Sequence, residues 1–269
     1  MVDRPDRPSD RSYSLEPEEE LVPPALPGLV DVVDVGEDVL DLLTADLLAQ
    51  AIDSVHRYGS FHLAISGSES LEPLCRRLMF DPDLRRLPWD RTHLWIADDR
   101  CVPRNDPLSC FWRLRDTLIM PAGIPLANVH PIPSTDESAD ELVEKALVRD
   151  LDGRSHGGGR LDCIILDTGG DGRVGGMFPG DDAVLEKTRR VRFAHCDDDP
   201  CPQWVSLTFP TILAARMIQV LACGSETGKM LRQLETRSQD VRNLPASRLV
   251  ESEGLLKWYL DREAAGDQE

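Results

Sequence analysis

Short apolar runs alternate along the chain with longer segments in which apolar residues recur every three or four positions. The short runs predict β-strands at residues 29–35, 61–65, 93–97, 161–166, 204–207 and 217–222. The longer segments predict helices at residues 39–58, 71–78, 111–118, 139–151, 210–215 and 229–234. Strands that alternate with helices are typical of right-handed βαβ units, in which consecutive strands lie parallel.

Two of the predicted strands are almost continuously apolar. Residues 163–166 read Cys-Ile-Ile-Leu, and residues 217–222 read Met-Ile-Gln-Val-Leu-Ala. A strand without alternating polar positions has both faces covered, as in a parallel sheet that lies between layers of helices. We therefore expect an α/β fold built on a doubly wound, mostly parallel, Rossmann-like sheet.

Composition sets a tail apart from this domain. Residues 1–28 are rich in Pro, Asp, Glu and Arg and contain almost nothing apolar before Leu21. Burial of such a segment cannot offset the conformational entropy that it would lose on ordering. We expect a disordered tail over residues 1–28 and a single α/β domain over residues 29–265.

Charge and hydropathy narrow the classes of partner. The chain has 48 acidic and 30 basic residues and a formal net charge of -18, so it would repel a nucleic acid or an anionic membrane. No run approaches the roughly 20 apolar residues that span a bilayer, and the first residues lack the apolar core of a signal peptide. We expect a cytoplasmic protein in which a local cluster of cations and backbone N–H groups binds any anionic ligand.

The seven cysteines are scattered and include no Cys-x-x-Cys pair. Reduced and mostly buried thiols are the simplest interpretation of such a set. The spacing of metal ligands is absent as well. We therefore expect neither a metal nor another cofactor.

Loops rich in small and charged residues follow several predicted strands. They cover residues 66–70, 98–103 and 167–180, and a fourth, at residues 224–229, opens a helix. Ligands bind at the carboxyl ends of the strands in open parallel sheets, where small residues let backbone N–H groups approach a phosphate. Each loop alone is weak evidence, but their joint occurrence favours an anion site with Arg100 and Lys229 as its cations.

Two nucleotide-binding patterns fail on inspection. Gly170, Gly172 and Gly175 match the spacing of the dinucleotide fingerprint, but Pro179 interrupts the segment before a helix could extend from them. Residues 224–229 are one residue short of a phosphate-binding P-loop and lack its final Ser or Thr. Neither pattern predicts a nucleotide.

Taken together, the loops resemble the 6-phosphogluconolactonase family, whose fold is shared with the glucosamine-6-phosphate isomerases. DDRCVP at residues 98–103, DG and FPG within residues 171–180, VSLTFP at residues 205–210 and LPASRL at residues 244–249 carry the resemblance. It implies hydrolysis of 6-phospho-D-glucono-1,5-lactone to 6-phosphogluconate in the oxidative pentose phosphate pathway, without metal or nucleotide. A base activates water in such a reaction, and hydrogen-bond donors stabilise the oxyanion.

The resemblance also implies a set of site residues. Those expected to bind the substrate or its phosphate are Ser66, Gly67, Ser68, Arg100, Gly169, Gly172 and Lys229. The residues expected to be catalytic are Arg173 and Asp171, at and beside the family's catalytic position, and His195, which precedes the VSLTFP segment. The partner is then a small sugar phosphate, and we expect a monomer or a weak homodimer. The other histidines are expected to be structural or exposed.

The chain departs from the family pattern at three positions. Arg173 stands where the family has a histidine base, and an arginine stays protonated and cannot accept a proton from water. Glu69 would repel a bound phosphate unless Arg173 or Lys229 neutralises it. Trp204 replaces a usual arginine.

These departures leave two questions open. The base is then Asp171 or Asp167, or alternatively His195. The leading interpretation is a lactone hydrolase, and the alternative is a catalytically weak or inactive relative that binds a sugar phosphate or another anion in a regulatory role. A sugar-phosphate isomerase of the same fold is a third interpretation, which also requires the missing histidine.

Overall fold

A seven-stranded sheet forms the centre of the computed structural model, which describes residues 23–33, 36–154, 158–236 and 240–266. The strand order is β1-β10-β9-β6-β2-β3-β5, and every neighbouring pair is parallel. The strands are β1 (Leu29–Val33), β2 (Phe61–Ile65), β3 (Thr92–Ile96), β5 (Val129–His130), β6 (Cys163–Asp167), β9 (Met217–Ala222) and β10 (Leu255–Asp261). The predicted parallel α/β sheet is confirmed.

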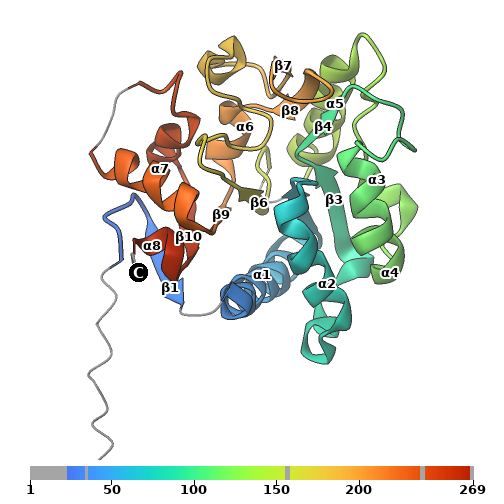
Figure 1. Ribbon diagram of the computed structural model, residues 1–269. Helices are drawn as coiled ribbons and strands as arrows, with labels where there is room; N and C mark the ends of the chain where they lie inside the picture. Colours follow the sequence, from blue (N-terminus) through green and yellow to red (C-terminus); the bar gives the residue numbers. More distant parts are fainter. Residues whose placement is uncertain (1–22, 34–35, 155–157, 237–239, 267–269) are drawn as a thin grey trace, which may run out of the picture.

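Eight α-helices connect and flank the strands within the described residues. They are α1 (Gly36–Tyr58), α2 (Glu72–Phe80), α3 (Cys110–Leu114), α4 (Met120–Ala122), α5 (Ala139–Leu147), α6 (Phe209–Ala214), α7 (Ser225–Glu235) and α8 (Arg262–Ala265). The helices α7 and α8 lie beside β1 and β10 at one end of the sheet, and α3 and α4 lie beside β3 at the other (Figure 1). The predicted helices at residues 111–118 and 139–151 continue past α3 and α5 as π-helical turns.

The middle of the sheet is the core of the domain. Every residue of β2, β6 and β9 is buried, as their continuous apolar character predicts. The apolar pattern did not predict β10, which lies between β1 and β9. Lys257 interrupts that strand, and its ammonium group is neutralised by Asp31 and Asp46, each at 2.6 Å.

A second, three-stranded antiparallel sheet contains β4 (Asp98–Arg100), β8 (Gln203–Leu207) and β7 (Val191–His195), in that order. The strand predicted at residues 204–207 therefore exists but belongs to this sheet and not to the parallel one. Only Ala97 separates the end of β3 from the start of β4, with which β8 pairs. The small sheet thereby brings the loop after β3 and the loop between β7 and β8 to the same place.

The segment before β1 is partly packed against the core. Leu26 is buried, and the Trp258 indole Nε1 donates to the Pro27 carbonyl oxygen at 2.8 Å. Most of the expected disordered tail, residues 1–22, lies outside the described residues, as do residues 34 and 35 of the first predicted strand.

Three imidazole rings from neighbouring strands form a stack away from the loops described above. The ring centroids of His62 and His93 lie 4.4 Å apart, and those of His93 and His130 lie 5.4 Å apart. The His130 ring also stacks on Trp95 at 3.7 Å. Burial lowers the pKa of all three histidines, to about 2 for His62 and about 4 for His130. The Asp150 carboxylate, 3.5 Å from His130, opposes this shift.

We expect this stack to make folding sensitive to acid. Because the folded-state pKa of His130 lies below its ordinary value of 6.5, the unfolded chain binds more protons, and stability is lost as the pH falls from about 6.5 towards 4. His130 accounts for roughly 1–3 kcal/mol of the free energy of unfolding that is lost over this pH range. Urea unfolding at pH 7 and pH 5 should show the loss, and His130→Gln should reduce it. An equal loss in the variant would contradict this prediction.

Candidate active site

A cavity of about 1360 Å³ opens at the carboxyl ends of the parallel strands. Its lining includes Ser66 after β2, Asp167 at the end of β6, Cys223 after β9 and Asp261 at the end of β10. Asp98, the first residue of β4, also lines it. The loops singled out by the sequence thus converge on one hollow, which is where ligands bind in open parallel sheets.

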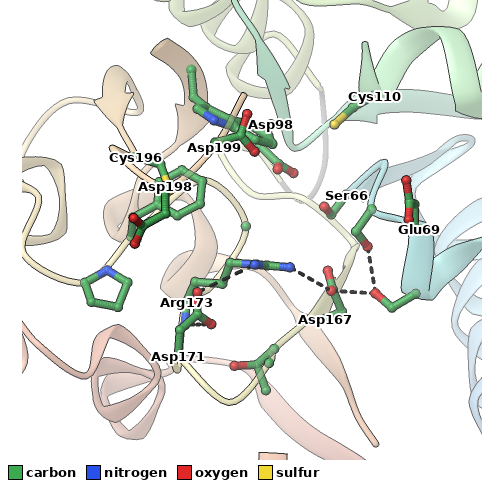
Figure 2. A pocket seen from close by; sticks show the side chains of 18 of the residues that line it. Ser66, Glu69, Asp98, Cys110, Asp167, Asp171, Arg173, Cys196, Asp198 and Asp199 are labelled. Atoms are coloured by element: carbon green, nitrogen blue, oxygen red, sulfur yellow. Dashed lines mark hydrogen bonds and ion pairs between the residues drawn. The ribbon is translucent and has the colours of Figure 1, made fainter. Parts of the chain in front are cut away.

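Asp167 is held in this cavity by a chain of hydrogen bonds. Its side chain is only 7% exposed. The Ser70 hydroxyl donates to Oδ2 of Asp167 at 2.5 Å, and the Ser68 hydroxyl lies 3.0 Å from that of Ser70. Figure 2 shows the Asp167 carboxylate beside the guanidinium group of Arg173. The geometry therefore fixes the orientation of the Asp167 carboxylate.

Arg173 reaches across the cavity from the loop after β6. Its Nη2 lies 3.9 Å from Oδ2 of Asp167, and its Nη1 lies 3.5 Å from Oδ2 of Asp171 (Figure 2). The loop turns at Gly172, whose φ of 72° favours glycine. Asp171 lies at the rim, with its side chain 43% exposed, and accepts a hydrogen bond from the backbone N–H of Arg173. Of the two predicted carboxylate bases, Asp167 is therefore the more enclosed.

A third carboxylate, that of Asp98, was not expected from the sequence. Its residue is 4% exposed. Burial, helped by the neighbouring charges of Asp167 and Asp99, raises the pKa of Asp98 to about 7. The Ser66 hydroxyl and the Arg173 guanidinium act in the opposite direction. Asp98 therefore exchanges a proton near neutral pH.

The neighbouring Asp99 has a structural role. Successive side chains of a strand point to opposite faces, so Asp99 points away from the cavity while Asp98 lines it. Its carboxylate accepts hydrogen bonds from the backbone N–H groups of Cys110 and Phe111 and from the Ser109 hydroxyl. These bonds join β4 to the start of α3.

Gly67 allows the loop after β2 to approach α3 closely. A Cβ atom at this position would lie 2.4 Å from the Cβ of Cys110, so a larger residue would push the loop away. Ser66 and Ser68 on either side line the cavity. Gly67 thus supports the site through packing.

Arg100 lines the cavity, but its donors are already engaged. Nε and Nη2 both donate to the carboxylate of Asp199 at 2.8 Å, and Nη1 donates to the Leu108 carbonyl oxygen at 2.9 Å. The guanidinium lies over the Trp204 ring, 4.3 Å from its centroid. A phosphate would have to displace Asp199 to bind the Nε and Nη2 edge of Arg100, and the predicted role of Arg100 in substrate binding stays a prediction.

The structure does not bring Lys229 to the cavity. The helix α7 begins at Ser225, so Lys229 lies inside the helix and not before it. Thr227 lines the cavity and is buried, and two residues correspond to about 200° of rotation around a helix. The Lys229 ammonium group therefore points elsewhere and pairs with Glu226 at 2.5 Å, on the exposed surface.

The remaining predicted residues lie at the edge of the site. His195, at the end of β7, lines the cavity, but its side chain is 53% exposed and its Nε2 lies 2.9 Å from Oδ1 of Asp197. Gly169 also lines the cavity, whereas Gly172 forms the turn that positions Arg173.

Glu69 has a cationic neighbour that the sequence analysis missed. The Nη2 of Arg113, in α3, lies 3.0 Å from Oε1 of Glu69, and Nη1 donates to the Gly67 carbonyl oxygen at 2.6 Å. Arg113 therefore neutralises Glu69, in place of the expected Arg173 or Lys229. Forty-four positions separate the two residues along the chain, so no local motif indicates their contact.

The described part of the chain contains no cluster of side chains that could hold a metal ion. None of its groups of three or more His, Cys, Asp or Glu side chains is arranged to hold a metal ion. In the same residues, no helix combines the length and the apolar character needed to cross a membrane.

Comparison with known proteins places this site in a family. A sequence profile described as glucosamine-6-phosphate isomerases/6-phosphogluconolactonase matches residues 35–258. The chain is 30% identical over 239 residues to the GDH/6PGL endoplasmic bifunctional protein of Oryctolagus cuniculus, covering 85% of this chain but 29% of that protein. It is 28% identical over 203 residues to the 6-phosphogluconolactonase of Haemophilus influenzae, covering 76% of this chain and 85% of that protein.

The fold comparison agrees with the sequence comparison. The structure of 6-phosphogluconolactonase from Trypanosoma cruzi is similar with a TM-score of 0.77 and 21% identity, over 89% of this chain and 96% of that one. The chain spans 29% of the length of the bifunctional relatives from Oryctolagus cuniculus and Homo sapiens. The match over residues 35–258 covers most of the described domain, and the chain belongs to the glucosamine-6-phosphate isomerase/6-phosphogluconolactonase family.

Proposed function

We propose that this protein hydrolyses 6-phospho-D-glucono-1,5-lactone to 6-phosphogluconate. The observation that carries the proposal is the pairing of an enclosed carboxylate, that of Asp167, with the Arg173 guanidinium in the cavity of a member of this family. Relatives over most of the chain's length bear the name 6-phosphogluconolactonase, including that of Haemophilus influenzae. Hydrolysis of a lactone needs a base to activate water and a donor to stabilise the oxyanion.

Asp167 takes the role of the base. Arg173 occupies the position at which the family carries a histidine, and a guanidinium cannot accept a proton at neutral pH. The Ser70 hydroxyl and Arg173 orient the Asp167 carboxylate from two sides. Asp167 removes a proton from a water molecule, and the hydroxide attacks the carbonyl carbon of the lactone.

Arg173 and Asp98 act on the two oxygen atoms of the lactone group, the carbonyl oxygen and the ring oxygen. The negative charge that develops on the carbonyl oxygen is stabilised by the Arg173 guanidinium, whose donors point into the cavity (Figure 2). When the bond between the carbonyl carbon and the ring oxygen breaks, the ring oxygen needs a proton. Asp98, with its pKa raised to about 7 by burial, is protonated in a large fraction of molecules at neutral pH and supplies it.

Lactone hydrolysis by the purified protein tests this function directly. The substrate hydrolyses spontaneously, so the rate is measured with freshly made lactone in a coupled 6-phosphogluconate dehydrogenase assay and compared with the uncatalysed rate. We expect a clear acceleration that Arg173→Ala reduces by roughly 10²–10³-fold, as for other single oxyanion donors. An exposed residue away from the cavity, Arg57, provides the control Arg57→Ala.

Binding of 6-phosphogluconate without any acceleration of lactone hydrolysis would contradict this proposal. If the folded protein does not accelerate the reaction but is stabilised against heat by 6-phosphogluconate, the chain is a binding protein and the proposal is wrong. A ligand at 100 times its dissociation constant adds roughly 2.7 kcal/mol of stability. Such a result would favour the regulatory alternative.

A further inference from the structure

Four arginine side chains line the cavity, and each of them contacts a carboxylate. They are Arg100, Arg113, Arg173 and Arg242. A substrate phosphate would compete with that carboxylate for the guanidinium. The four pairs differ in how readily the carboxylate can give way.

Arg100 and Arg173 are poorly suited to exchange their partners for a phosphate. The carboxylate of Asp199 is 12% exposed and holds Arg100 through two hydrogen bonds. Arg173 contacts Asp167, and the proposed reaction needs both groups where they are. Displacement at either position would break an enclosed contact or disturb the reacting groups.

Arg242 has an exposed partner but is itself loosely held. Its side chain is 51% exposed, and the partner carboxylate of Asp182 is 83% exposed. A long and half-exposed side chain loses rotational freedom when it binds a ligand, which weakens binding.

Arg113 combines an enclosed guanidinium with an exposed carboxylate partner. Its side chain is 18% exposed, whereas that of Glu69 is 85% exposed. The bond from Nη1 to the Gly67 carbonyl oxygen, at 2.6 Å, fixes the guanidinium against the loop after β2. An ion pair with so exposed a partner is weak and is lost easily. The Glu69 carboxylate can therefore swing into solvent while Arg113 stays in place.

The surroundings of Arg113 favour a phosphate in the place of Glu69. Ser68, which follows Gly67, lines the cavity beside it, and its hydroxyl can donate to an anion if it turns away from Ser70, to which it donates in this structure. A guanidinium matches two phosphate oxygens, and hydrogen bonds between charged groups are stronger than those between neutral ones. Lys229, which the sequence analysis expected to be a cation of the site, does not line the cavity, and Trp204 stands where the family usually has an arginine.

We propose that Arg113 binds the phosphate group of the substrate and that Glu69 competes with the phosphate for it. The inference rests on the proposed function, because it assigns the phosphate of a phosphorylated lactone. It makes Arg113 a determinant of specificity for phosphorylated over unphosphorylated lactones. Arg113 acts on binding and lies apart from the proposed base, since it contacts Gly67 and Glu69 and not Asp167.

Steady-state kinetics on two lactones test the role of Arg113. For Arg113→Ala we expect KM for 6-phosphogluconolactone to rise by about tenfold or more, the loss expected for a charged hydrogen bond, with kcat little changed. The kcat/KM for unphosphorylated glucono-1,5-lactone should stay the same. Equal losses on both lactones, or an unchanged KM, would overturn the proposal. Arg115→Ala is the control, because Arg115 lies two residues away and stacks on Trp112 outside the cavity lining.

A second variant keeps the test independent of folding and turnover. Glu69→Gln changes an exposed side chain and removes the competing charge, so it should bind 6-phosphogluconate several-fold more tightly in calorimetry. Weaker or unchanged binding would contradict the competition. Because this measurement needs no turnover, it separates the two proposals: absence of lactonase activity with tighter binding in Glu69→Gln would refute only the proposed hydrolysis.

Discussion

Replacing Asp167 with asparagine should lower kcat for lactone hydrolysis by roughly 10²–10⁴-fold, the usual contribution of a general base. The amide keeps the shape of the carboxylate and can still accept the Ser70 hydrogen bond, but it cannot take a proton from water. The enclosed position of Asp167 beside Arg173 makes it the base best placed to act. KM should change much less than kcat. The coupled assay measures both values.

Two further variants decide among the carboxylates and the histidine. Asp171→Asn removes the exposed rim carboxylate and should reduce the rate only modestly, and His195→Gln should do the same. If Asp167→Asn keeps its activity while one of these variants loses it, the assignment of the base is wrong. The rate should also fall above about pH 7, as Asp98 loses the proton that it donates.

Removing the Asp162 carboxylate should lower the free energy of unfolding by about 3–5 kcal/mol, because it leaves a buried guanidinium without its counter-charge. The Asp162 side chain is fully buried, and that of Arg154 is 7% exposed, with 3.0 Å between Nη1 and Oδ2. The same carboxylate accepts the backbone N–H of His62 at 2.8 Å and lies 3.4 Å from Nε of Arg216. Asp162→Ala therefore disrupts several contacts between the start of β2 and the segment before β6.

Urea unfolding monitored by tryptophan fluorescence measures this loss. The matched control is Asp53→Ala, which removes another aspartate paired with an arginine, but on the exposed surface of α1. That change should alter stability by less than about 1 kcal/mol. Similar midpoints for Asp162→Ala and Asp53→Ala would contradict the importance of burial for this pair.

The sequence predicted the central strands because strands that are buried on both faces are almost continuously apolar. The runs that became β2, β6 and β9 are apolar along almost their whole length, and all their residues are buried. The strand β10 was missed because Lys257 interrupts its pattern, and the two carboxylates that neutralise it come from β1 and α1. A pattern along one segment cannot reveal such partners.

Among the site residues, too, the sequence predicted what a local pattern indicates and missed what depends on contacts between distant segments. Strand-end loops predicted the place of the cavity, because the carboxyl ends of parallel strands meet at one edge. Lys229 lies outside the cavity lining, because α7 turns Thr227 inward instead. Burial raises the pKa of Asp98, and the Gly67 carbonyl oxygen, on a loop far away along the chain, holds the Arg113 guanidinium in the cavity lining. Both depend on tertiary packing, which local sequence does not encode.

The place of β10 between β1 and β9 imposes an order on folding during synthesis. The first strand pairs only with β10 in the described sheet, and about 220 residues separate the two along the chain. At about 5–20 residues per second, a ribosome needs on the order of 10–40 s to translate that interval. Throughout it, β1 has no partner, and once β9 has emerged it presents an open edge until β10 inserts. Until β10 emerges, the unpaired edges of β1 and β9 can pair with wrong strands.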